Sequence, residues 1–313
     1  MRGSVLGSVR MGAVLTAMAA GIVGLQAPTA GAAPACAGVV VTKVEPSPTL
    51  TGWSENVGYD AAGNLWVSRI LENVVERRDR QGRVTARVRV ESPGAVRRGP
   101  DGLLYVASGD SPINMLPGTP LIGKVLRIDP RRLSVPPTVF ARGLGMPNGL
   151  AVDRTGDVYV SDGRLGVVRI RPDGSIDRAW SAAAPKNLSP NATVNGTGVN
   201  GATIVGRTLY VTLTTSASGR VLRVPLADPG AHSVAADLTA PLPGVLDDLT
   251  QVTPGRLAVA STTGQVHLVD LATRRTCTVN VGQPVTAVAA VPGSTGRLVA
   301  ATESGALLTL SVR

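Results

Sequence analysis

The sequence has 313 residues, enough for one large domain, and 43% of them are hydrophobic, so a sizeable core is available. Aromatic residues make up only 3%, while 37 glycines and 23 prolines are spread along the chain, which favours short strands and turns over long helices. The net charge of +10 comes from arginines in separate clusters without aromatic partners, and this argues against a nucleic-acid-binding protein.

The first 33 residues have the pattern of a secretory signal peptide. Arg2 and Arg10 give a positive start, an apolar stretch follows at 11–25, and small residues stand at 30–35 before the expected cleavage point. The apolar stretch is short for a membrane span, and no second one follows. We therefore expect an exported, soluble protein with no membrane span, whose single mature domain covers residues 36–313.

An internal repeat of roughly 40–55 residues organises the rest of the chain. Each repeat has an apolar segment, a turn with glycine and a second, strongly apolar segment. The second segments are residues 65–67, 104–106, 158–160, 209–211, 257–259 and 298–300. Most are apolar at successive positions, which indicates strands buried on both faces. A radial stack of sheets buries both faces of every blade, so the sequence predicts an all-β, six-bladed β-propeller.

Individual blades are predicted as four antiparallel strands. The clearest is the third, with strands expected at Asn148–Val152, Val158–Ser161, Gly166–Ile170 and Ser175–Trp180. The last repeat has room for only about three strands, and the segment Val39–Val44 is expected to supply the missing fourth and close the ring.

The chain has two cysteines, Cys36 just before the closing strand and Cys277 in the fifth repeat. Export makes a disulfide between them plausible, and such a bond would fasten the closure of the ring. Two unpaired thiols are the alternative that the sequence leaves open.

Four repeats carry a polar residue nine or ten positions before the second apolar segment. These residues are Glu55, Asn148, Asn200 and Asp247. The other two repeats place Gly94 and the apolar stretch 285–288 there. The innermost strands of a propeller surround its axis, so residues at their starts should meet at one end of the ring. Two carboxylates and two amide oxygens are hard donors that suit Ca²⁺, and the chain has no Cys or His cluster for zinc.

Asp247 is also the best candidate for a general base or nucleophile, while a role as a ligand alone stays open. The neighbouring Asp248 is expected in the outer shell of the site. Alternatively, the Asn-Gly pairs at 148–149 and 200–201 and the Asp-Asp pair are ordinary turn residues.

The two histidines, His232 and His267, are expected to be structural, which leaves a Ser-His-Asp triad without support. Asp110 and Asp162 each follow a second apolar segment and are expected to cap turns, with a role facing the central channel as the alternative.

These features resemble the regucalcin/gluconolactonase-like six-bladed propellers, related to the paraoxonases and diisopropylfluorophosphatase. The resemblance spans most of residues 40–313 and rests on segments 55–67, 147–153, 200–201 with 209–212, and 247–249. It implies a catalytic divalent cation, usually calcium, at the Glu, Asn, Asn and Asp positions named above. It also implies hydrolysis of lactones or phosphotriesters, with Asp247 as the catalytic carboxylate.

We therefore expect a secreted, calcium-dependent hydrolase that acts on lactone-like small molecules, esters or phosphotriesters, and that works as a monomer. One alternative is a non-catalytic NHL-type scaffold, because residues 147–153 followed by 158–160 also resemble an NHL repeat. The other is a strictosidine-synthase-like propeller, whose chemistry needs a carboxylate and an apolar pocket without an obligatory metal.

Overall fold

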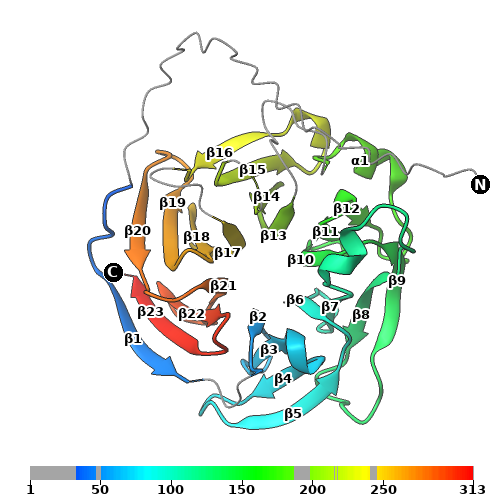
Figure 1. Ribbon diagram of the computed structural model, residues 1–313, viewed down its shortest axis with the longest axis horizontal. Helices are drawn as coiled ribbons and strands as arrows, with labels where there is room; N and C mark the ends of the chain where they lie inside the picture. Colours follow the sequence, from blue (N-terminus) through cyan, green and yellow to red (C-terminus); the bar gives the residue numbers. More distant parts are fainter. Residues whose placement is uncertain are drawn as a thin grey trace, which may run out of the picture.

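Residues 33–46, 51–186, 198–214, 216, 218–239 and 245–312 are described by the structure, a computed structural model. In this part of the chain, six antiparallel sheets stand radially around a central axis (Figure 1). The predicted all-β, six-bladed β-propeller is confirmed. The expected signal peptide lies outside the described residues except for Ala33. No helix among the described residues is long and apolar enough to cross a membrane.

Blades are numbered in chain order, with the innermost strand first. Blade 1 contains β2 (Ser54–Tyr59), β3 (Leu65–Arg69), β4 (Val74–Arg78) and β5 (Val84–Arg89). Blade 2 contains β6 (Pro93–Arg98), β7 (Leu104–Ser108), β8 (Gly123–Ile128) and β9 (Thr138–Leu144). Blade 3 contains β10 (Pro147–Val152), β11 (Val158–Asp162), β12 (Gly166–Ile170) and the helix α1 (Arg178–Ala183).

Blade 4 contains β13 (Val199–Val205), β14 (Thr208–Leu213), β15 (Arg220–Pro225) and β16 (Ser233–Asp237). Blade 5 contains β17 (Leu246–Thr253), β18 (Arg256–Ser261), β19 (Gln265–Asp270) and β20 (Thr276–Asn280). Blade 6 contains β21 (Val285–Ala290), β22 (Arg297–Thr302), β23 (Leu307–Val312) and the N-terminal β1 (Val39–Glu45). Three short 3-10 helices of the described residues lie between strands of the blades: η1 (Ile70–Glu72), η2 (Pro112–Met115) and η3 (Pro229–Ala231).

The core of the described residues is divided into six hydrophobic clusters, each between two neighbouring blades. Leu104 packs with Trp66 of blade 1, whereas the next residue, Tyr105, packs with Leu150 of blade 3. Successive side chains of a strand point to opposite faces, so a blade between two neighbours needs apolar residues at both positions. This packing explains the continuous apolar runs in the sequence.

Blade 3 departs from the prediction, because the fourth strand expected at Ser175–Trp180 is absent. Ile170 and Ile176 form only an isolated bridge, and α1 follows. The Asp177 side chain accepts a hydrogen bond from the Trp180 N–H at 3.1 Å and so caps the start of the helix. The Trp180 ring then packs 5.2 Å from that of Tyr159, and thus the helix covers the blade as a strand would.

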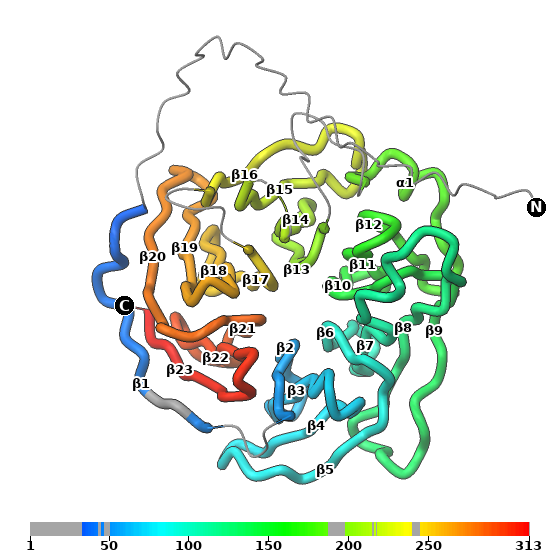
Figure 2. Tube along the Cα trace, viewed as in Figure 1, coloured from blue at the N-terminus to red at the C-terminus, as the bar shows by residue number. Residues whose placement is uncertain are grey.

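The ring closes as predicted, with β1 beside β23 at the outer edge of blade 6 (Figure 2). Their antiparallel pairing runs from Val39 opposite Val312 to Glu45 opposite Leu307. The expected disulfide between Cys36 and Cys277 is present, with the two Cα atoms 4.8 Å apart. The N-terminal segment is therefore bonded to blade 5 and paired with blade 6.

Candidate functional site

Each innermost strand has a β-bulge near its start. In blade 1, Ser54 pairs with Arg69 and Asn56 with the adjacent Ser68, so Glu55 is the extra residue. The corresponding residues of the other blades are Gly94–Ala95, Asn148, Asn200–Gly201, Asp247–Asp248 and Thr286. A bulge leaves its extra residue outside the strand pairing and re-aims its side chain. The repeated slot in the sequence is this bulge.

Glycines allow the bulges of neighbouring blades to touch. A Cβ atom on Gly149 would lie 2.1 Å from the carbonyl oxygen of Asn200. One on Gly201 would lie 2.5 Å from the Cα of Asp248. The Asn-Gly pairs therefore do more than form turns, since the glycine lets the next inner strand approach closely.

Hydroxyl groups connect these backbones further. The Thr212 hydroxyl donates to the carbonyl oxygen of Asp247 in the next blade and accepts from the Gly201 N–H at 2.8 Å. In the same way Ser68 donates to the carbonyl oxygen of Gly94 at 2.6 Å. The bulges are thus fixed to one another from blade to blade.

The side chains of Glu55 and Asn148 meet at this end of the axis. The Asn148 Nδ2 donates to Glu55 Oε1 at 3.1 Å and to Asp110 Oδ2 at 3.0 Å. The second Glu55 oxygen accepts from Trp53 Nε1 at 2.8 Å. The structure therefore adds Asp110, at the end of β7, to the residues that the sequence singled out. Blade 2 has Gly94 and Ala95 in its bulge, neither with a polar side chain, and Asp110 contributes the polar group that this blade would otherwise lack.

Burial perturbs the carboxylic acids of this cluster. Loss of hydration raises the pKa of Glu55, and it raises the pKa values of Asp110 and Asp247 well above their ordinary range. The negative charge of Glu55 raises the pKa values of the other two further. Glu303, at the end of β22, adds a smaller repulsion to both Glu55 and Asp247. Such a cluster needs either protons or a cation to be stable.

Comparisons with known proteins give the fold. No family model matches the chain, and no curated protein sequence matches it. A gluconolactonase from Xanthomonas campestris superposes with a TM-score of 0.66 at 18% identity, over 92% of this chain and 99% of that one. The calcium-binding protein regucalcin from Agrobacterium tumefaciens gives 0.62 at 18% identity, over 90% and 97%. Virginiamycin B lyase from Staphylococcus aureus gives 0.59 at 12% identity, over 88% and 100%.

At these identities the comparisons show a shared propeller fold. The expected resemblance to regucalcin and gluconolactonase is confirmed at that level. The lyase shares the same architecture with a different chemistry, so the fold alone does not assign an activity. The activity must be argued from the side chains of this chain.

The donors at the bulges fit a hard cation in their chemistry. Asn200 is buried, and its Oδ1 has no hydrogen-bond partner among the described residues. An orphaned buried oxygen is a donor that a bound cation would satisfy. As a ligand, Asn148 would turn its Oδ1 inward by a half-turn of the amide group. No group of three or more His, Cys, Asp or Glu in the described residues is arranged to hold a metal ion, so the amides are needed.

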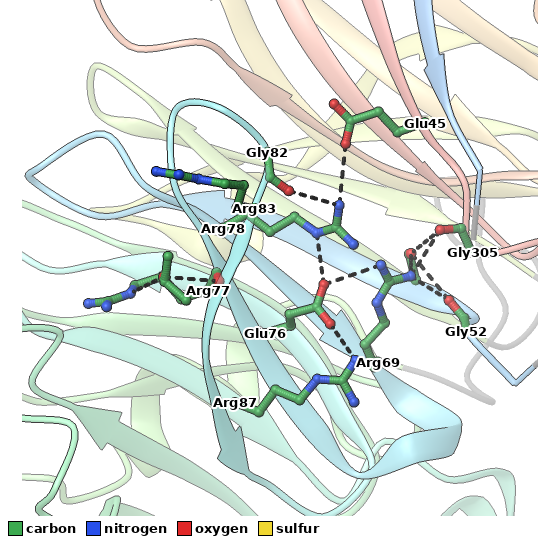
Figure 3. Close-up of polar contacts among 12 residues, drawn as sticks. Glu45, Gly52, Arg69, Glu76, Arg77, Arg78, Gly82, Arg83, Arg87 and Gly305 are labelled. Carbon is green, nitrogen blue, oxygen red and sulfur yellow. Dashed lines mark hydrogen bonds and ion pairs between the residues drawn. The ribbon is translucent and has the colours of Figure 1, made fainter. Parts of the chain in front are cut away.

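A buried arginine holds the segment that leads into Glu55 (Figure 3). The Nη1 atom of Arg69 donates to the carbonyl oxygen of Gly52 at 2.6 Å, the hydroxyl of Ser54 at 2.6 Å and the carbonyl oxygen of Gly305 at 2.9 Å. Its Nη2 lies 3.5 Å from Glu76, which also accepts from Arg78 and Arg87. Arg69 thus joins blade 1 to blade 6 beside the site.

The other polar residues considered in the sequence have partners of their own. Asp162 accepts hydrogen bonds from the N–H groups of Arg164 and Leu165, as expected of a turn cap. His267 lies in β19 with its Nδ1 2.9 Å from the Thr278 hydroxyl, and His232 follows η3. Neither histidine is on an innermost strand. Asp248 is buried and pairs with Arg97.

Proposed function

We propose that this chain is an exported, calcium-dependent hydrolase of small lactone-like esters. The observation that supports this most directly is the set of hard donors in the bulges of four inner strands. These donors are Glu55, Asn148, Asn200 and Asp247. The disulfide between Cys36 and Cys277 is typical of an oxidising compartment and so supports export.

In this proposal the four side chains bind Ca²⁺ through oxygen atoms, and water and substrate complete its shell. The bound ion would polarise the carbonyl of the ester and stabilise the negative charge that develops there. The raised pKa values of Glu55 and Asp247 support this assignment, because a cation would compensate the charges that burial penalises.

Asp247 is the proposed general base. One of its carboxylate oxygens takes the proton of the attacking water as the water oxygen adds to the ester carbonyl. The bond between the carbonyl carbon and the alcohol oxygen then breaks, and the alcohol leaves with the proton that Asp247 returns. Burial and the neighbouring carboxylates raise the pKa of Asp247, and a bound cation would lower it again, which keeps Asp247 ionised and able to accept the proton. In the ion-free arrangement, Asn148 Nδ2 joins Glu55 to Asp110, and rotation of this amide would exchange those hydrogen bonds for a bond to the ion.

The first test is thermal unfolding of the mature protein in EDTA and then with added Ca²⁺. An ion that binds only the folded state at 100 times its Kd contributes about 2.7 kcal/mol, so the Tm should rise by several degrees. The rise should disappear in Asp247→Asn and Glu55→Gln. Glu72→Gln serves as the matched control, because Glu72 forms a surface ion pair with Arg87 and should leave the rise unchanged.

The second test is hydrolysis of aliphatic and sugar lactones and of phosphotriesters by the calcium-loaded protein. Loss of turnover in Asp247→Asn with weakened but measurable calcium binding would support the role as a base. A wild-type protein with no calcium-dependent Tm shift would refute the metal site. A clear shift without hydrolysis of any of these compounds would leave a calcium-binding scaffold and refute the hydrolase.

A further inference from the structure

A second polar layer lies directly beside the proposed site. Asn56 follows Glu55 in the chain, and Asp248 follows Asp247. Asn56 Nδ2 donates to Asp248 Oδ2 at 3.1 Å, although blades 1 and 5 are not neighbours in the ring. This hydrogen bond therefore crosses the central axis.

Arg97, on β6 of blade 2, joins both partners. Its Nη2 lies 2.5 Å from Asp248 Oδ2, and its Nη1 lies 2.6 Å from Asn56 Oδ1. The same Nη1 donates to the carbonyl oxygens of Val57 and Val96 at 3.1 and 3.0 Å, so the backbone fixes the guanidinium. We call Asn56, Arg97 and Asp248 the axial brace.

One end of the brace is buried and the other reaches a cavity. The Asp248 side chain is fully buried, whereas that of Arg97 is 19% exposed. Arg97 lines a cavity of about 470 Å³, together with Tyr59 at the end of β2 and Ala289 on β21. Glu55 and Asp247 do not line this cavity. Of the three residues of the brace, Arg97 is the one that lines this cavity.

We infer that Arg97 is a positioning residue: by tying Asn56 to Asp248 across the axis, it fixes the separation of the Glu55 and Asp247 carboxylates. Each of these carboxylates is one peptide unit from a member of the brace, so a shift of Asn56 or Asp248 is transmitted directly. The consequence for calcium rests on the proposed function, whereas the mechanical coupling of β2 to β17 does not.

A buried ion pair also affects stability, and the test must separate this effect. Arg97→Met leaves Asp248 as an unpaired buried charge, which destabilises any fold. The double variant Arg97→Met/Asp248→Ala removes both charges and also the acceptor of the hydrogen bond from Asn56, so no side-chain connection across the axis remains. Arg97→Lys keeps a cation at the same place, and Arg98→Met, at the next and exposed position, is the matched control.

Amide hydrogen exchange in EDTA measures the mechanical coupling, and calorimetric titration with Ca²⁺ measures the affinity. In the double variant we expect exchange at 54–57 and 246–249 to accelerate and calcium affinity to fall, each about tenfold. Arg98→Met should match the wild type, and Arg97→Lys should lie between it and the double variant, because one ammonium replaces the two nitrogens that hold Asn56 and Asp248.

Wild-type exchange and wild-type calcium affinity in the double variant would overturn the inference and leave the brace as a dispensable ion pair. A wild-type protein that binds no calcium, combined with faster exchange in the double variant, would refute the proposed function and support the brace.

Discussion

Burial of the His267 side chain should make the free energy of unfolding of this protein depend on pH in the acid range. Only 7% of its surface is exposed, and burial lowers its pKa from 6.5 to about 4. As the pH falls below about 6.5 the unfolded chain gains this proton first, so the free energy of unfolding decreases until about pH 4. Between pH 7.5 and 5 this residue should account for a loss of about 2 kcal/mol.

The measurement is denaturant unfolding of the wild type and of His267→Gln at these two pH values. Glutamine cannot titrate, so the variant should lose about 2 kcal/mol less on acidification. Equal pH dependence in both proteins would mean that the folded state accommodates a protonated His267.

Asp110 and Asp162 mark how far single residues could be predicted from the sequence. Both end second strands, and both were expected to cap turns. Asp162 accepts hydrogen bonds from the backbone N–H groups of the tight turn that follows it, so the predicted turn cap is confirmed. Asp110 instead contacts Asn148 of the next blade. The difference comes from a neighbouring blade, and spacing within one repeat contains no information about it.

At the scale of the strand, the approach of inner strands depends on glycine at fixed places. In Gly149→Ala the added Cβ would lie 2.1 Å from the carbonyl oxygen of Asn200, and no side-chain rotation relieves a clash with backbone. We expect a destabilisation of about 3 kcal/mol and loss of the calcium-dependent rise in Tm. Thermal unfolding with and without Ca²⁺ measures both.

Gly255→Ala is the control for this substitution. Its Cβ would meet nothing within 4 Å, but its φ of 76° is in the left-handed region, so only about 1 kcal/mol of backbone strain is expected. If the two alanine variants were equally stable and both bound calcium, the inner strands would not need close contact at the bulges.

The elements themselves were predictable where burial decides the residue types. Segments such as 104–106 are apolar at successive positions because each blade packs on two neighbours, and this pattern is visible in the sequence. The helix in blade 3 was not predicted, because the apolar residues of Ser175–Trp180 suit a strand as well. The bulges could not be predicted either, since a bulge is defined by the pairing of two strands, although its residue types did recur.

For the whole molecule, stability depends on joining the two ends of the chain. Each of the six clusters lies between two blades. If blades 6 and 1 separated, each would expose an apolar sheet face to water. Two devices hold blade 6 complete, the pairing of β1 with β23 and the disulfide from Cys36 to Cys277. Both act where the ring closes. The strand pairing stabilises the folded state through hydrogen bonds, whereas the disulfide restricts the unfolded chain and so raises its free energy.

Replacement of both cysteines separates the contribution of the disulfide from that of the strand pairing. The bond spans 241 residues, for which the chain-entropy relation gives about 5 kcal/mol. In Cys36→Ser/Cys277→Ser we expect a loss of several kcal/mol in denaturant unfolding, with the secondary structure unchanged because β1 still pairs. Deletion of residues 1–46 should cost more and cause self-association, since it exposes the edge of β23. If the double variant associated as readily as the truncated chain, the disulfide and not the strand pairing would hold the ring closed.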